Sequence, residues 1–552
     1  MHLCRETYTQ ILTPIRVQIL GLYSTTKALR QANRLIESMQ STFSIIEQCG
    51  EELPHAIDEK VTKDMMIMNA TLQKMTDESI LSTEYTMDKR TILLMKLYAE
   101  LANTLHWINP SLIGAVSLRL ADLTLKNGLT PLCPLAFVHF CSALANMGNE
   151  YIADGCRLGT CGYFLRVISS WNTFIFISSS CRCHVNVNVS TTGRLALKLS
   201  DRADSCVCKS GVIFFAYQSV LWAAVPLPAI ADAHRQGHKV GERSGDYLYS
   251  TLNYFTSNII SYFAGENLST MRKELRDSFL KMQGKSHQSF IGWGNMSLMH
   301  LQYVILQDGE ERLNEERVDD VPGLKAVMVD SGKPDATVSM LDKILFVQRL
   351  FFFRRFDDTS FDAINISEEI FEKKHFLRPQ LLLGIFFEGL LAFQCARRES
   401  NHLRKEEWMR RGESASKRMM CLSDHLAWNW ENKSLLLIAE KLYTDGNFDQ
   451  AASCYDKAVR SANEHRFIHE EAMACELAGD FYYERNSQKS YAFFVHSIEC
   501  YMKWGAFAVA RRVESSLGVR SGSYFAQLEP NKDCLEAIYS SRNGHSKKRQ
   551  DI

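Results

Sequence analysis

The stretch from Lys433 to Ala510 constrains the fold of this chain more than any other. Small and large apolar residues recur there at the spacing of two helices joined by a turn, and a weaker copy follows about 40 residues later. Gly446 lies where the turn is expected, because glycine adopts backbone conformations that other residues avoid. Small residues let two helices approach closely, and aromatic residues fill the space between them. The stretch therefore predicts helices packed in antiparallel pairs.

These positions match the pattern of a tetratricopeptide repeat. The small, large, turn and aromatic positions of the first copy are occupied by Ala439, Leu442, Gly446, Phe448, Ala451, Tyr455 and Ala458. The equivalent places in the second copy are held by Gly479, Tyr482, Asn486 and Tyr491. The sequence therefore predicts an all-α fold, a TPR-like α-solenoid of antiparallel helix pairs.

The overall composition supports helices and excludes one class of partner. Only 11 Pro and 29 Gly occur among 552 residues, which favours helices over a turn-rich β protein. Lysine plus arginine balances aspartate plus glutamate at 63 each. A general nucleic-acid binder needs a basic face, so we expect no nucleic-acid partner.

The cysteines and the apolar segments indicate the cellular compartment of the protein and whether it spans a membrane. The 16 cysteines are scattered, and no secretory signal is recognisable at the N-terminus, so we expect reduced thiols and a cytoplasmic protein. The most apolar windows, Gly211–Ala231 and Phe164–Ser180, are interrupted by proline or polar residues. We therefore expect buried helices there and no membrane span.

Changes in pattern along the chain suggest seven segments. In order, we expect an N-terminal helical array (1–159), an atypical insert (160–193), a helical array (194–307), an acidic linker (308–335), a helical array (336–432), TPR-like repeats (433–515) and a C-terminal end with a basic disordered tail (516–552).

The insert at 160–193 has no helical period and is rich in Ser, Val, Asn and Phe. Residues 184–190 alternate like a short strand. Without the insert, the helical pattern of the sequence before Thr160 would continue directly at Arg194. Two interpretations remain open: a retained intron in the gene model, or a genuine surface insertion that forms a disordered segment or a loose hairpin.

The part of the sequence with a helical pattern resembles a known group of proteins. From Met75 to Gly159 helix follows helix, with a break at Asn109 and Pro110 and a stop at Gly128. The pattern resumes at Arg194 and covers most of the chain. It resembles the TPR-like helical region that follows the AAA/STAND-type predicted ATPase module in large multidomain signalling proteins, which are fused to serine/threonine kinase, histidine kinase or nucleotide cyclase domains.

The resemblance implies a non-catalytic helical-repeat scaffold for protein–protein interaction or for coupling signals between domains. The partner would be a protein or peptide, whose identity stays open. Two alternatives are a fragment of a longer ATP-binding AAA-ATPase or protein kinase whose catalytic domains are missing from this chain, and a free-standing TPR adaptor.

No catalytic or cofactor-binding motif is complete. Gly284, Lys285 and Ser286 resemble half of a phosphate-binding loop, but Phe279 stands where a second glycine is required. The stretch before them is helical in pattern, whereas the motif follows a strand. We therefore expect no enzyme activity, no catalytic residues and no cofactor.

Metal-ligand spacings are equally weak, and we expect no metal site. The cysteine and histidine groups considered are Cys181, Cys183, His184, Cys206 and Cys208, the pair His465 and His469, and the pair His139 and Cys141. Cys-x-Cys is a poorer zinc pair than Cys-x-x-Cys. His465 and His469 are predicted to share a helix face without a third ligand, and His139 and Cys141 to lie in a buried helix.

The inner face of the first repeat argues against one kind of partner. Repeats that bind chaperone tails present lysine and asparagine there, whereas this chain has Leu436, Glu440 and Tyr443. Leucine offers no hydrogen bond, and a glutamate would repel a terminal carboxylate. We therefore expect no co-chaperone role.

Overall fold

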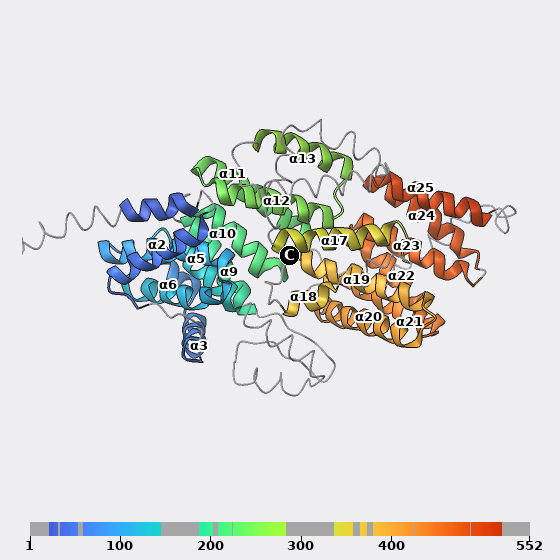
Figure 1. The fold of residues 1–552 in the computed structure, drawn as a ribbon, viewed down its shortest axis with the longest axis horizontal. Helices are drawn as coiled ribbons and strands as arrows, with labels where there is room; N and C mark the ends of the chain where they lie inside the picture. The colour runs from blue at the N-terminus through green and yellow to red at the C-terminus, as the bar shows by residue number, and fades with distance from the viewer. Residues whose placement is uncertain are drawn as a thin grey trace, which may run out of the picture. The chain divides into compact units, whose positions relative to one another are not determined.

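In this computed structural model, the residues described below are 21–30, 34–52, 59–144, 187–202, 208–223, 225–282, 336–356, 365–372, 379–424, 427–485 and 487–521. Regular structure in these ranges is helical, and the β-type pairing they contain is an isolated bridge between Tyr85 and Leu129 (Figure 1). The predicted all-α class is confirmed.

The chain divides into two compact units, which are described one at a time. Unit 1 consists of Met1–Ile175, Asn186–Leu221 and Ala233–Tyr254. Unit 2 consists of Phe176–Val185, Trp222–Asp232 and Phe255–Ile552.

Unit 1 is built from helices whose ends follow local sequence rules. They are α2 (Leu35–Gln48), α3 (Glu59–Lys74), α4 (Asp77–Leu81), α5 (Lys89–Ile108), η1 (Pro110–Leu112), α6 (Ile113–Asn127), a helix at Cys133–Leu144, α9 (Val187–Arg202), α10 (Lys209–Phe215) and η2 (Ala216–Val220), with parts of α11 (Leu227–Ser244) and α12 (Tyr247–Phe263). Asp88 caps α5 by accepting hydrogen bonds from the backbone of Arg90 and Thr91. Asn109 ends α5, and Gly128 ends α6 with φ +99°, as predicted.

The core of unit 1 contains the histidine that the sequence placed in a buried helix. His139 and Cys141 are both fully buried. Asn103 Oδ1 lies 3.1 Å from His139 Nε2 and accepts a 2.8 Å hydrogen bond from the Tyr249 hydroxyl. Burial lowers the pKa of His139 to about 3, so the ring is neutral. The packing prediction for this pair is confirmed.

Helix α9 corrects part of the expectation for the insert. It begins at Val187, inside the predicted insert, so the short-strand interpretation is wrong for residues 187–190. An existing helix extends by one residue at a time at little cost, whereas an isolated strand has no partner for its backbone. Residues 160–186 lie outside the described residues.

Unit 2 contains the stretch Lys433–Ala510, for which the sequence predicted repeats, and that stretch is helical. Its helices include α13 (Leu268–Met282), α17 (Ala336–Phe352), α18 (Ile366–Glu372), α19 (Pro379–Arg398), α20 (His402–Ser423), α21 (Ala427–Thr444), α22 (Phe448–Glu464), α23 (Ile468–Tyr483), α24 (Lys489–Trp504) and α25 (Phe507–Ser521). From α19 to α25 each helix packs against the next one in the chain.

Helix α19 packs against α17, α18, α20 and α21, and its residues 379–396 are all buried. Among the described helices it is the one whose length and apolar composition would also suit a membrane span, and that apolar stretch is wholly buried inside the protein. The core helix of a soluble protein meets the same criteria, so this signal is weak evidence for a span.

Some positions of the first predicted copy are packed as expected. Ala439, Ala451, Tyr455 and Ala458 are fully buried between helices. Gly446 forms the turn between α21 and α22 with φ +81°. Phe448, the other aromatic position, is 46% exposed at the start of α22.

The prediction that His465 and His469 share a helix face is wrong. His465 follows the last residue of α22, whereas His469 lies in the first turn of α23. Arg466 separates them with φ +64°, a left-handed conformation that stops the first helix. His469 is buried, with its ring centroid 5.1 Å from that of Trp504.

Several predicted features lie outside the described residues. They are the acidic linker (308–335), the half phosphate loop at Gly284, Lys285 and Ser286, the cysteine and histidine positions Cys181, Cys183, His184 and Cys206, the repeat position Asn486, and the tail beyond residue 521. Cys208 is described, and its thiol donates to the carbonyl oxygen of Pro131 at 3.2 Å.

Candidate functional site

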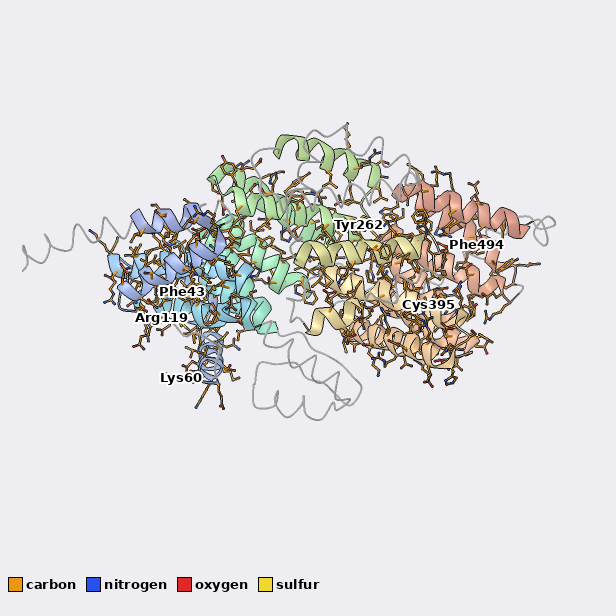
Figure 2. The ribbon with its side chains drawn as sticks, viewed as in Figure 1. Phe43, Lys60, Arg119, Tyr262, Cys395 and Phe494 are labelled. Atoms are coloured by element: carbon orange, nitrogen blue, oxygen red, sulfur yellow. The ribbon has the colours of Figure 1, made fainter. Side chains whose placement is uncertain are left out.

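Unit 2 contains a polar cavity of about 770 Å³. Its lining comes from the end of α17 and from α19, α20, α21, α23, α24 and α25, so it is built by both the predicted repeats and the helices before them. Phe494, labelled in Figure 2, belongs to the α24 wall. The volume lies in the usual range for ligand sites, about 300–1,000 Å³. The lining is richer in charged residues than in apolar ones.

Arg354 enters the cavity from an unusual backbone position. Helix α17 ends in a turn in which the amides of Arg355 and Arg354 donate to the carbonyls of Leu350 and Phe351. Such a turn puts one residue in the left-handed region, normally glycine, and here Arg354 has φ +56°. Its Nε donates to Glu476 Oε1 at 2.8 Å, and its Nη2 lies 3.0 Å from Asp480 Oδ2. Two carboxylates thus hold an arginine where glycine is usual.

Glu476 is a buried carboxylate of the cavity wall with three donors. It is 3% exposed and accepts hydrogen bonds from Arg354, from Arg512 at 2.7 Å and from the Tyr501 hydroxyl at 3.0 Å. Burial by itself would raise the pKa of Glu476, but Arg354 and Arg512 outweigh burial and lower it to about 2. Glu476 is therefore ionised at neutral pH and cannot supply a proton there.

Glu440, taken from the sequence as a repelling charge, is neutralised. It is 1% exposed, is paired with Arg397, and accepts hydrogen bonds from Tyr455 at 2.6 Å and Gln394 at 2.9 Å. Arg397 also donates to the Thr444 hydroxyl at 2.8 Å. The assumption of an unopposed charge at this inner position is wrong, because an arginine from the preceding helices neutralises it.

Two cations of the lining have no carboxylate partner among the described residues. Arg398 uses one guanidinium nitrogen to donate to the backbone and side-chain oxygens of Gln394, both at 2.8 Å, and its guanidinium carbon lies 4.4 Å from the Phe356 ring centroid. Lys405 is exposed at the start of α20. Burial and the nearby guanidiniums of Arg397 and Arg354 lower the pKa of Arg398. This part of the cavity is therefore electropositive.

The sequence predicted no site residues, and this cavity was missed. Three of its four arginines, Arg354, Arg397 and Arg398, lie outside the repeat pattern, just after α17 and at the end of α19, and the fourth, Arg512, lies in α25. The available signal was a pair of basic residues after each apolar run, Arg354–Arg355 and Arg397–Arg398. That signal marks a helix end, where basic side chains are common, and it does not show which glutamates the arginines meet.

No protein-family model matches this sequence, and no curated protein matches it.

Proposed function

We propose that this protein is a non-catalytic helical-repeat scaffold that binds an acidic peptide segment of a partner protein in the cavity of unit 2. In this proposal α21–α24 are two TPR-like helix pairs, and the chain couples the bound partner to neighbouring parts of a signalling assembly. The observation that carries the proposal is the cavity, where the paired charges are buried and Arg398 and Lys405 keep their charges available.

The buried ion pairs support binding rather than proton transfer. Arg354, Arg397 and Arg512 are fixed by Glu476 and Glu440, so the cavity wall is rigid and largely neutral. With Asp480 and Glu484 also in the lining, Arg398 and Lys405 bring the total to five basic and four acidic side chains, an excess of one positive charge. Arginine suits this role because its planar guanidinium can donate two parallel hydrogen bonds to a carboxylate.

A peptide with spaced Asp or Glu residues is complementary to this surface. Aromatic side chains, Phe356 and Tyr443 among them, line the same cavity and offer apolar contacts between the charges. The expected occupant is therefore an extended acidic segment that also contains apolar residues. Attraction between opposite charges would speed association and make binding sensitive to salt.

The test is binding of a fluorescein-labelled peptide with alternating Glu and Leu, measured by fluorescence anisotropy with the full chain. We expect saturable binding that weakens as salt is raised, and none for the same peptide with Gln in place of Glu. The double variant Arg398→Glu/Lys405→Glu should weaken binding at least about tenfold, which is about 1.4 kcal/mol.

The matched control is Lys417→Glu, which reverses an exposed charge on the same helix away from the cavity lining. It should leave the affinity within about twofold, as expected for a distant surface charge. Equal losses for Lys405→Glu and Lys417→Glu would show that only net charge matters. That result, or equal binding of the Glu and Gln peptides, would overturn the proposal.

A further inference from the structure

A second cluster lies between α23 and α24, away from the cavity lining. His496 and Cys500 are four residues apart on α24, so both side chains leave the same face of that helix. Glu471 reaches them from α23. One ligand atom from each residue lies within 4.8 Å of the other two. The three atoms are a nitrogen, a sulfur and an oxygen, a set that suits a borderline divalent ion such as zinc.

The distances fit a common centre with little movement. His496 Nε2 lies 2.7 Å from Glu471 Oε1 and 3.5 Å from Cys500 Sγ. In a tetrahedral zinc site with bonds of about 2.0–2.3 Å, ligand atoms are about 3.3–3.8 Å apart. The Nε2–Sγ separation already agrees, and the Nε2–Oε1 separation needs to open by less than about 1 Å.

The ligands have the supporting contacts typical of metal sites. Asn463 Nδ2, from α22, donates to both carboxylate oxygens of Glu471 at 3.1 and 3.2 Å and orients that group. The other ring nitrogen of His496, Nδ1, lies 4.0 Å from Glu499 Oε2. That distance is too long for a hydrogen bond, so the Asn463 contact is the supporting interaction of this cluster.

Burial and charge also favour an ion. Glu471 and Cys500 are 5% and 2% exposed, whereas the His496 side chain is 17% exposed and gives access from solvent. When Zn²⁺ binds, the thiol proton leaves to solvent and sulfur coordinates as thiolate. One carboxylate, one thiolate and a neutral imidazole then balance the charge of the ion, so no net charge is buried.

We propose that Glu471, His496 and Cys500 form a zinc site with three protein ligands and a fourth position open to water. The ion joins α23 to α24, because each helix contributes ligands. This site differs from every cysteine and histidine group that the sequence suggested, and it does not depend on the peptide-binding proposal.

The test is titration of the full, reduced chain with Co²⁺, which reports thiolate ligation by a charge-transfer absorption band, followed by displacement with Zn²⁺. We expect one ion per chain at the cluster. His496→Gln and Cys500→Ala should each remove the band. Each should weaken Co²⁺ binding by more than about 10–100-fold, which is the usual effect of losing a residue that only supports a metal ligand. Zn²⁺ should also raise the Tm of the parent protein and not that of His496→Gln.

The matched controls are Cys454→Ala, which removes a half-buried thiol from α22, and Cys475→Ala, which removes the buried thiol of α23. Both should keep the band. A band that survives in His496→Gln and Cys500→Ala, or that disappears only in Cys475→Ala, would overturn the assignment. Absence of Co²⁺ binding to the folded parent protein would do the same.

Discussion

Two glutamates on α23 show how neighbours decide the state of a buried charge. Glu476 and Glu470 are 3% and 2% exposed. Two arginines surround Glu476, and its pKa falls to about 2. Glu470 has Lys433 and Asn432, and there burial dominates and raises the pKa. The same residue type on one helix therefore has a pKa below its ordinary value at one position and above it at the other.

The depressed pKa of Glu476 predicts a loss of stability in acid. In the unfolded chain the group takes up a proton near its ordinary pKa of 4.5, whereas in the folded protein it does so near about 2. Its contribution is therefore fully present above about pH 4.5 and is lost as the pH falls to about 2, and it amounts to about 3 kcal/mol. Urea unfolding between pH 7 and pH 2 measures it.

In that experiment Glu476→Gln should be less stable than the parent protein at neutral pH. Its free energy of unfolding should also fall less between pH 4.5 and pH 2. Glu464→Gln, at an exposed position of α22, should leave the curve as in the parent protein. An unchanged slope in Glu476→Gln would contradict the assignment of this decline to Glu476.

At the scale of elements, close contact between α23 and α24 depends on a missing side chain. A Cβ atom added at Gly479 would lie 2.9 Å from ring atoms of Phe494, nearer than real side chains allow. Ser490 also donates to the Gly479 carbonyl at 2.9 Å. The repeat pattern required a small residue at this position, and the structure identifies the aromatic ring that makes it necessary.

Gly479→Ala should therefore destabilise the protein by about 1–3 kcal/mol, because the clash outweighs the better helix propensity of alanine. The comparison is Gly518→Ala in α25, where no atom lies within 4 Å of an added Cβ. That variant should be neutral or gain up to about 1 kcal/mol. Thermal or urea unfolding measures the stability of both variants relative to the parent protein. A Gly479→Ala variant as stable as the parent would contradict the prediction, because it would mean that the two helices separate easily.

At the scale of the whole molecule, the insert at 160–193 is the strongest break in the sequence pattern. Helix α9 begins at Val187, so the segment to test is 160–186. We predict that joining Gly159 to Val187 leaves the helix content intact and the Tm unchanged within about 2 °C. We expect the segment to be a loop from its sequence, and changing the length of a loop costs little.

A second variant, with residues 160–186 replaced by a Gly/Ser segment of equal length, separates the effect of sequence from that of length. It should behave like the deletion in circular dichroism and thermal unfolding. A loss of several degrees in both variants would mean that this segment packs against the helices and is a genuine part of the fold.

The sequence predicted features that depend on nearest neighbours in the chain. Asn109 before Pro110, Gly128 and Gly446 end helices by their own backbone preferences, and those boundaries are confirmed. Ala451 and Ala458 are buried because helical spacing puts small residues on the packed face. The sequence failed at Arg466, because a left-handed arginine carries no local signal comparable to glycine.

The candidate sites depend on pairs that are distant in the sequence. Arg354 meets Glu476 across 122 residues, and Arg397 meets Glu440 across 43. Glu471 and His496, 25 residues apart, come together from two different helices, α23 and α24. Periodicity shows which face of a helix is apolar, but it does not show which charged side chain lies opposite another. The sequence alone therefore determined the helices and their turns, and tertiary packing decided which charges are neutralised, which stay available, and where three metal-ligand atoms converge.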